Sequence, residues 1–421
     1  MSTIKPFRGL YYTDKSTKSN NLSRVVCPPY DMISNEQKEE LKSKNEFNAV
    51  NLELPNSYEE AKKTLDEWIK NKILTFDETP SIYIYEISYK VNTETYRLKG
   101  IIGGLKLPEK DENYVMTHKN INNAYEIDRI ELLDKTKCEF NPICVLYNDD
   151  ENQIKHMLHT VAKSNYLAKS KQNNLIHKIW KISDPDTITA FEELFNDKTY
   201  YIADGHNRFK AACSYREKLR ETENISEDHP ANFVMTFFVD QNNEALTILP
   251  IHRIISNINM FDSDDMLERS SQYFDIIKCK TLKSTRNTMF GLRRENKNAF
   301  GIYTDGYYCV LVLKDGSIMK EISNQSDAYN KLDITVLHKL FFEKILNIES
   351  EQITYSQSAN KACQCVDNGD ACFAVLLSAT RINEVINISK NRENMPPKST
   401  LFFPKPVSGL IFYSLDQNNE K

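Results

Sequence analysis

The segment YYIADGHNRFKAACSYREKL, residues 200–219, gathers an acid, a histidine and an arginine within five residues. The apolar run Tyr200–Ala203 predicts a central strand, and apolar residues at helical spacing after it predict a helix. The polar residues therefore fall at a helix N-terminus, where unpaired N–H groups and the helix dipole attract an anion. This position predicts an anion-binding turn.

The side chains of this turn suit phosphate chemistry. Gly205 lets the backbone approach a ligand closely, and the guanidinium of Arg208 matches the geometry of a phosphate. His206 can donate a hydrogen bond or a proton, and Asp204 can hold Mg²⁺ or accept a proton. Helix capping by Asp204 or Asn207 explains one polar residue but not the whole set. We therefore expect the turn to serve phosphoryl transfer.

The composition indicates which classes of protein to exclude. The chain has 421 residues, with 54 Lys and Arg against 59 Asp and Glu, giving a net charge of -5. No polyanion partner is indicated, and no apolar run reaches the length of a membrane-spanning helix. The odd number of cysteines, 9, fits a reducing compartment. We expect a globular cytoplasmic protein with no nucleic-acid or membrane partner.

Strands and helices alternate irregularly along the first half of the chain. The segment KPFRGLYY predicts a strand, and Pro28 and Pro29 predict a turn after it. Ser34 predicts the N-cap of a helix at 35–44, and a second helix is predicted at 58–71. Two alternating strands, at 81–91 and 96–107, predict a hairpin. The pattern favours an α+β fold with a mixed sheet.

The rest of the chain predicts a second region. The segments NFVMTFFVD and ALTILPIHRII predict two strands of a hairpin, and the acidic stretch 262–265 is the expected boundary. We therefore divide the chain into a catalytic region at 1–260 and an additional α/β region at 261–421. The Pro-rich, aromatic segment NMPPKSTLFFPKPVSGLIFYSL is expected to close back over a site or a core face.

The motif DGHNRFKAA resembles the Asp-Gly-His-His-Arg motif of the free-serine kinases in the ParB/sulfiredoxin superfamily. Further blocks resemble a long family with the same motif. They are KPFRGLYY, VVCPPYDMIS, NLELP, DRIELLDKT, NPICVLY, ILPIHR and MPPKSTLFFPKPVSGL. The resemblance implies a ParB/sulfiredoxin-like fold and a kinase that converts free L-serine to O-phospho-L-serine with Mg²⁺. It also implies a place in serine metabolism and cysteine biosynthesis.

The resemblance assigns roles to the residues of the motif. It implies that Asp204, His206 and Arg208 act on the donor phosphates and the metal, with Gly205 and Asn207 in the same phosphate-binding turn. Asn207 stands where the family has a second histidine, and an amide cannot carry a proton.

Residues outside the motif receive roles from the other matching blocks. Glu53, in NLELP, is expected near the serine hydroxyl, with Asp31 behind it as a substrate-binding residue. Either Glu53 or Asp204 is expected to take the proton of the serine hydroxyl. Lys119 replaces a glutamate of the family and receives no metal role. The remaining assignments are phosphate binding by Arg129 and Arg253 and substrate binding by His118 and His252, although His252 and Arg253 also fit a structural pair.

Neighbouring chemistries can be distinguished by single residues. A sulfiredoxin needs a cysteine after the motif glycine, where this chain has His206. A DNA-binding ParB-like protein needs a basic helix-turn-helix after the motif, but the sequence there is the acidic ETENISEDHP. This argues against DNA binding. A non-catalytic nucleotide- or DNA-binding protein is therefore the weaker alternative to a kinase. Cys363, Cys365 and Cys372 lack a fourth zinc ligand and are expected to be thiols.

The phosphoryl donor is predicted from what the sequence lacks. No glycine-rich nucleotide-binding loop is found, and pyrophosphate needs only a compact cluster of donors and cations. Arg8, Arg129, Arg208, Arg253 and Lys398 supply such cations if the fold gathers them. We therefore expect pyrophosphate as the donor, with ATP or ADP as the alternative. The sequence makes no prediction of the oligomeric state.

Overall fold

The computed structural model describes residues 3–17, 20–120, 123–162 and 165–416. It divides the chain into two compact units, Met1–Leu246 with Pro404–Lys421, and Thr247–Phe403. This division differs from the boundary expected near residue 260, because the C-terminal segment returns to the first unit. There Ser408 bridges to Cys27, and Phe412 bridges to Leu10. These bridges connect the later part of the Pro-rich, aromatic segment to the N-terminal part of the first unit.

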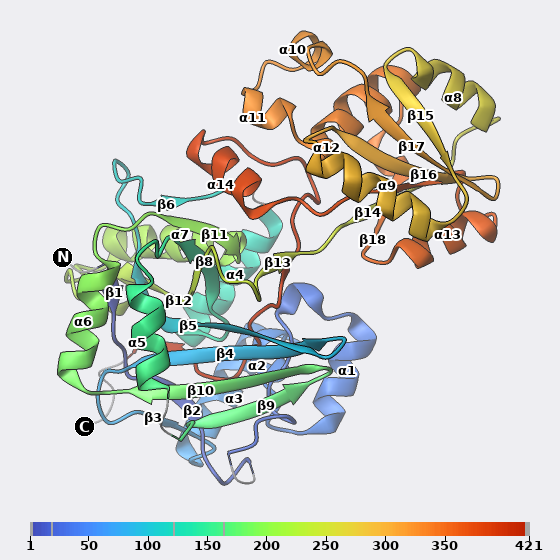
Figure 1. Ribbon diagram of the computed structural model, residues 1–421. Coiled ribbons are helices and arrows are strands. Elements are labelled where there is room, and N and C mark those ends of the chain that lie inside the picture. Colours follow the sequence, from blue (N-terminus) through green and yellow to red (C-terminus); the bar gives the residue numbers. More distant parts are fainter. Residues whose placement is uncertain (1–2, 18–19, 121–122, 163–164, 417–421) are drawn as a thin grey trace. The chain divides into compact units, whose positions relative to one another are not determined.

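The first unit is built on a mixed sheet of nine strands, as far as the described residues show. Its order is β6 (Val115–Met116), β11 (Tyr200–Asp204), β8 (Ile143–Tyr147), β12 (Phe233–Asp240), β5 (Glu94–Lys106), β4 (Ile82–Val91), β10 (Leu175–Ile182) and β9 (Ala168–Gln172), with β1 (Ile4–Lys5) on β5. Strand β8 runs antiparallel to β11 and parallel to β12. The predicted mixed sheet and the β4–β5 hairpin are confirmed (Figure 1).

Helices and two small strand pairs surround this sheet. The helices are η1 (Tyr30–Met32), α1 (Asn35–Lys44), α2 (Val50–Glu53), α3 (Tyr58–Lys70), α4 (Asn123–Thr136), α5 (Gln153–Val161), α6 (Pro185–Phe195), α7 (His206–Thr222) and η2 (Pro230–Asn232). The strand pairs are β2 (Leu10–Tyr12) with β3 (Leu74–Phe76) and β7 (Cys138–Glu139) with β21 (Tyr413–Ser414). Ser34 caps α1 through a capping box, as predicted.

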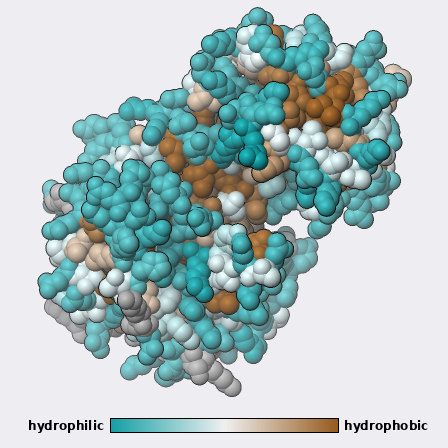
Figure 2. Space-filling view, in the orientation of Figure 1, coloured by the Kyte–Doolittle hydropathy of each residue, from teal (hydrophilic) through white to brown (hydrophobic). Residues whose placement is uncertain are grey.

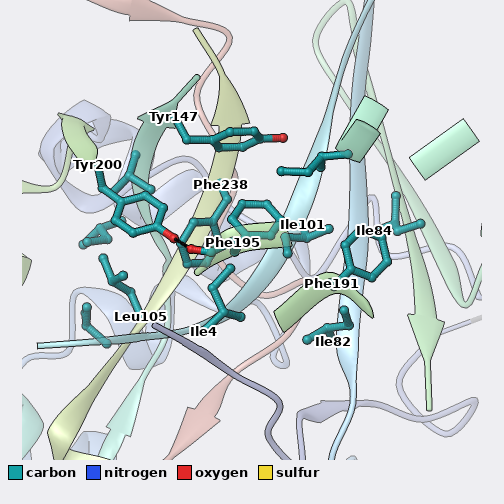
Figure 3. Close-up of a cluster of buried hydrophobic side chains, with 14 of the residues drawn as sticks. Ile4, Ile82, Ile84, Ile101, Leu105, Tyr147, Phe191, Phe195, Tyr200 and Phe238 are labelled. Carbon is teal, nitrogen blue, oxygen red and sulfur yellow. Dashed lines mark hydrogen bonds between the residues drawn. The ribbon is translucent and has the colours of Figure 1, made fainter. Parts of the chain in front are cut away.

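The core of the first unit lies where α5, α6 and the start of α7 pack on the sheet. Phe191 and Phe195 of α6 are fully buried among sheet residues that include Ile84, Ile101 and Phe238 (Figure 3). Burial of each aromatic side chain contributes about 2–3 kcal/mol. This core fixes β8 and β11, and with them the turn that leads into α7.

The second unit contains a six-stranded sheet in which each described pair of strands is antiparallel. The order of its strands is β15 (Phe274–Cys279), β17 (Tyr307–Leu313), β16 (Ala299–Thr304), β19 (Phe373–Leu376), β14 (His252–Ile255) and β18 (Ile353–Ser356). A separate two-stranded sheet is formed by β13 (Thr247–Ile248) and β20 (Phe402–Phe403). The remaining elements are α8 (Ser263–Ser271), α9 (Leu282–Arg294), α10 (Ile318–Ile322), α11 (Asp327–Asn330), α12 (Asp333–Thr335), the π-helix η3 (Val336–Leu346), η4 (Ser350–Gln352), α13 (Ala359–Asp367) and α14 (Ile382–Lys390). Helices α9 and α13 contribute to one buried hydrophobic cluster of this unit. Helices α8 and η3 contribute to another.

The predicted hairpin of 232–240 with 245–255 is wrong. Strand β12 pairs with β5 and β8, whereas the later segment forms β13 and β14 in the second unit. Pro250 separates these two short strands because proline has no N–H group for a sheet ladder.

The face shown in Figure 2 is mostly hydrophilic, with hydrophobic side chains gathered in a few patches. No helix of the described residues combines the length and hydrophobicity that crossing a membrane requires.

Candidate active site

The candidate site begins at the turn between β11 and α7. Gly205 adopts φ +89° and is the N-cap of α7. A Cβ atom at this position would lie 2.8 Å from Cγ2 of Ile143, so the turn needs glycine for both its backbone conformation and its packing. The pairing of β11 with β8 shifts register between Ile202 and Asp204. The irregularity places Asp204 at the very end of the strand, directly before the helix.

Asp204 is buried between two cations. Its Oδ1 atom lies 2.8 Å from Nζ of Lys405, and its Oδ2 atom lies 3.0 Å from Nη2 of Arg208. Burial raises the pKa of Asp204, but Lys405 and Arg208 lower it more strongly, so the pKa is below its ordinary value. Asp204 is therefore a carboxylate at neutral pH that holds two cations at the start of α7.

Lys405 joins Asp204 to a second acid. Its Nζ atom also lies 2.9 Å from Oδ2 of Asp31, which belongs to η1. Burial lowers the pKa of Lys405, and Asp204 and Asp31 raise it more, so the ammonium form is favoured. The N-terminal segment, the motif and the C-terminal segment thus meet at one ammonium group.

Arg208 is held in a fixed orientation. Its Nη1 atom donates to the side chain of Asn141 and to the carbonyl oxygens of Asn141 and Pro142, the latter at 2.7 Å. Its Nε atom is buried and has no hydrogen-bond partner among the described residues. The Nε–H group of Arg208 is therefore available to a ligand, and its position is set by the contacts of the guanidinium with Asn141, Pro142 and Asp204.

His206 is a neutral imidazole. The backbone N–H of His118 lies 3.4 Å from Nε2 of His206, and the two rings are perpendicular with centroids 4.5 Å apart. Burial, followed by His118, Lys119 and Arg208, lowers the pKa of His206 well below its ordinary value. Because Nε2 accepts this hydrogen bond, Nδ1 carries the proton. His206 is thus suited to donate a hydrogen bond and carries no positive charge at neutral pH.

Glu53, at the end of α2, is buried beside Arg129 of α4. Arg129 Nη1 lies 3.8 Å from Glu53 Oε1 and donates to the Glu53 carbonyl oxygen at 3.2 Å. Arg129 also bonds the carboxylate of Asp128 and lies over the ring of Tyr30 at 4.2 Å. Burial raises the pKa of Glu53, and Arg129 and Arg208 oppose this increase. Glu53 is therefore better suited than Asp204 to accept a proton.

A small cavity lies beside Glu53, Arg129 and Arg208. It has a volume of about 50 Å³ and is lined by charged residues from four elements and by apolar walls. The charged residues are Glu53, Arg129, Glu139 and Arg208. A buried water needs roughly 10–15 Å³ of such volume, so the cavity has room for a few waters or a comparably small polar molecule, but not for a nucleotide.

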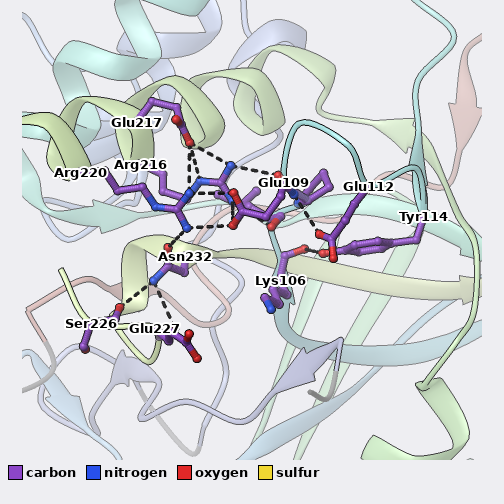
Figure 4. Close-up of polar contacts among 12 residues, drawn as sticks. Lys106, Glu109, Glu112, Tyr114, Arg216, Glu217, Arg220, Ser226, Glu227 and Asn232 are labelled. Atoms are coloured by element: carbon purple, nitrogen blue, oxygen red, sulfur yellow. Dashed lines mark hydrogen bonds and ion pairs between the residues drawn. The ribbon is translucent and has the colours of Figure 1, made fainter.

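The far end of α7 is fastened by a separate ion-pair network. Arg216 donates to the carbonyl oxygens of Leu107 and Pro108, and Arg220 forms two hydrogen bonds with the carboxylate of Glu109 (Figure 4). Arg220 also donates to the side chain of Asn232. These contacts fix the position of the helix whose first turn carries the site.

The structure brings most of the predicted site residues together. Within the first unit the contacts above connect Asp31, Glu53, His118, Arg129, Asp204, Gly205, His206 and Arg208, and Asn207 lies beside the Tyr30 hydroxyl. His252 and Arg253 lie instead in β14 of the second unit. There His252 Nδ1 accepts a hydrogen bond from the Leu377 N–H, and buried Arg253 donates to the carbonyl oxygens of residues 251, 397 and 398.

The predicted cation cluster is gathered only in part. Arg129 and Arg208 line one cavity, whereas Arg253 and Lys398 belong to the second unit. Sequence reasoning missed Lys405, Glu139 and Asn141. Lys405 lies in the block MPPKSTLFFPKPVSGL, so its signal was present in the sequence. Asn141 begins the block NPICVLY, so its signal was present as well. Glu139 carried no signal, because only the fold brings it near Arg208.

A resident metal does not fit these side chains as they are placed. Both carboxylate oxygens of Asp204, the predicted Mg²⁺ ligand, contact cations. Among the residues that the structure describes, no group of three or more His, Cys, Asp or Glu side chains could hold a metal ion. The nine cysteines are free thiols, as expected for Cys363, Cys365 and Cys372.

A family model described as a protein of unknown function, DUF1015, matches residues 4–335. Among curated proteins, none matches the chain.

Solved structures show weak similarity. A conserved hypothetical protein from Pyrococcus furiosus is 14% identical with a TM-score of 0.32, covering 70% of this chain and 91% of its own. A free serine kinase in complex with AMP is 12% identical with a TM-score of 0.33, covering 70% and 88%. SbnI with a C-terminal truncation, from Staphylococcus aureus, is 9% identical with a TM-score of 0.37, covering 76% and 90%. Similarity at this level does not support an argument about activity.

Proposed function

We propose that this chain, which belongs to the DUF1015 family, is a kinase that phosphorylates free L-serine to O-phospho-L-serine. One observation carries the proposal: the start of α7 gathers Arg208 and Lys405 on Asp204, next to a small cavity that contains Glu53. A helix N-terminus with two cations suits a phosphate donor, and the cavity suits a small acceptor. The motif's resemblance to free-serine kinases, with their ParB/sulfiredoxin-like fold, agrees with both.

In this mechanism the donor phosphates bind at the first turn of α7. Arg208 and Lys405 contact them, the Nδ1–H group of His206 donates a hydrogen bond, and Asp204 positions the two cations. Because its pKa is lowered, Asp204 is a poor proton acceptor. Mg²⁺ enters the proposal only as a counterion of the donor.

Glu53 accepts the proton of the serine hydroxyl in this mechanism. Its raised pKa makes the carboxylate a stronger base than an ordinary glutamate. The serine oxygen forms a bond to the transferred phosphorus, the bond from phosphorus to the leaving phosphate oxygen breaks, and the proton passes to Glu53. Positioning and charge neutralisation supply the catalysis.

The preferred donor in the proposal is pyrophosphate, with ATP and ADP as alternatives. The cations on Asp204 form the compact cluster that pyrophosphate needs.

The test is direct. Purified protein is incubated with L-serine, Mg²⁺ and each of pyrophosphate, ADP and ATP, and phosphoserine is measured by mass spectrometry. We expect phosphoserine with pyrophosphate and its loss in Glu53→Gln. If no donor yields phosphoserine, the proposed function is wrong. A higher kcat/KM for a nucleotide would overturn only the choice of donor.

A further inference from the structure

The cavity beside Arg208 contains a second carboxyl group that the mechanism above does not use. Glu139, in β7, lines it together with Glu53, Arg129 and Arg208. The other walls are mostly apolar and include Leu132, Phe140, Ile143 and Val234. Charged groups in so apolar an enclosure require polar contents to satisfy them.

The carboxyl group of Glu139 is only partly satisfied. One oxygen, Oε2, accepts a hydrogen bond of 2.6 Å from the backbone N–H of Met235. Among the described residues the carboxyl group makes no other hydrogen bond and no ion pair, whereas Glu53 has Arg129 beside it. Glu139 therefore keeps hydrogen-bonding capacity for whatever occupies the cavity.

The surroundings of Glu139 explain its charge state. Desolvation raises the pKa of Glu139 to about 8, against the opposing effects of the Met235 N–H and of Arg208 in α7. Glu139 is thus a largely neutral carboxylic acid at pH 7. The other titratable groups around it are Glu53 of α2, Arg129 of α4, Cys138 of its own strand and Tyr413 of β21.

We infer that Glu139 binds the ammonium group of the amino-acid acceptor, and that the cavity is selective for small acceptors that carry such a group. The inference rests on the proposed function for the identity of the acceptor. A free amino acid is a zwitterion, and the cavity offers two carboxyl groups and two guanidinium groups in a small volume. Glu139 is the carboxyl group there that no cation holds.

Binding by this route releases a proton. The neutral Glu139 carboxylic acid loses its proton to solvent when the ammonium group enters, and the resulting carboxylate accepts hydrogen bonds from the ammonium. The amino acid keeps all of its own protons. Because the bound state needs the carboxylate, apparent affinity for serine increases about tenfold per pH unit until the pH reaches the pKa of Glu139.

Calorimetry on the unaltered protein tests this exchange. Serine is titrated into the protein, with methylenediphosphonate present as an unreactive donor analogue, at pH 7 in Pipes and in Tris, whose ionisation enthalpies differ. We expect release of close to one proton per serine bound. 3-Hydroxypropanoate, which lacks the ammonium group, should bind more weakly and release none. Serine binding without proton release, or no serine binding, would overturn the inference.

Kinetics of Glu139→Gln provide a second test. Glutamine keeps an acceptor for the Met235 N–H, so folding is expected to survive. Loss of a charged hydrogen bond raises KM for serine by roughly 10–100-fold, while kcat changes by only a few fold. The decrease of KM between pH 6 and 8 should disappear. Glu86→Gln, a buried glutamate of β4 outside this cavity, is the control and should keep the KM of the unaltered protein.

The outcomes separate the two claims. Phosphoserine formation with an unchanged serine KM in Glu139→Gln would leave the proposed function standing and overturn the role of Glu139. Proton-linked serine binding without any phosphoserine would support the role of Glu139 and contradict the kinase.

Discussion

The ammonium group of Lys405 lies 2.8 Å from Oδ1 of Asp204, so a residue of the C-terminal segment completes the turn that begins α7. The same group lies 2.9 Å from Oδ2 of Asp31. Because the segment from Pro404 belongs to the first unit, the candidate site needs the C-terminal end of the chain as well as its motif. Lys405 holds the segment to the site by charge and supplies a cation beside the first turn of α7.

Replacement of Lys405 by alanine should reduce kcat/KM by about 100-fold, because one cation at the transferred phosphate is lost. The Michaelis constant for the donor should rise more than that for serine, and Lys405→Arg should recover part of the activity. Lys218→Ala is the control, since Lys218, in the last turns of α7, pairs with Asp134 and does not line the cavity. Equal effects of both alanine variants would show that Lys405 has only a structural role.

Arg208→Ala should lower kcat and raise the donor KM together, with a loss of about 100-fold in kcat/KM. Arg208→Lys should not restore activity. A single ammonium group cannot bond Asn141, Pro142 and Asp204 in the planar geometry of the guanidinium. Steady-state kinetics with each substrate varied in turn would check this. If Arg208→Lys kept an activity within a few fold of the unaltered protein, the planar guanidinium would not be required, and this prediction would be wrong.

Local sequence patterns predicted the elements that position the turn. The apolar run of β11, the glycine after it and the helical spacing of α7 are all local features, and each is found where predicted. Ser34 likewise predicted the start of α1, and the alternation of apolar residues predicted β4 and β5. Both signals are local, because a helix cap or the buried face of a strand is encoded within a few residues.

The remainder depends on contacts between distant segments. The return of Lys405 to Asp204 and the hydrogen bond from the Met235 N–H to Glu139 depend on tertiary packing, which no local sequence pattern encodes. The neutral state of His206 has the same origin, since burial beside His118 lowers its pKa. The division of the chain was predicted incorrectly because the sequence shows where acidic residues cluster and not where the final segment pairs.

Gly205→Ala should reduce both stability and activity. A left-handed conformation costs a residue with a Cβ atom about 1–2 kcal/mol, and here the Cβ would also lie 2.8 Å from Ile143. Gly306→Ala is the control, since Gly306 has φ +77° but no atom within 4 Å of the added Cβ. We expect thermal unfolding to show the larger loss for Gly205→Ala, and only this variant to lose phosphoryl transfer. Equal losses of stability would contradict the packing contribution of Ile143.

The pKa of Glu139 predicts how stability depends on pH. The folded protein keeps the carboxyl group protonated up to a pKa of about 8, whereas the unfolded chain releases this proton near the ordinary value of 4.5. The folded state therefore binds one more proton between these values, and the contribution of Glu139 to the free energy of unfolding is lost as pH rises through this window, by about 1.4 kcal/mol per pH unit. Glu139→Gln should remove this slope. Urea unfolding of both proteins at several values between pH 5 and 8 measures it, with Glu86→Gln as the control. Parallel curves for the unaltered protein and Glu139→Gln would contradict the buried, neutral state of this carboxyl group.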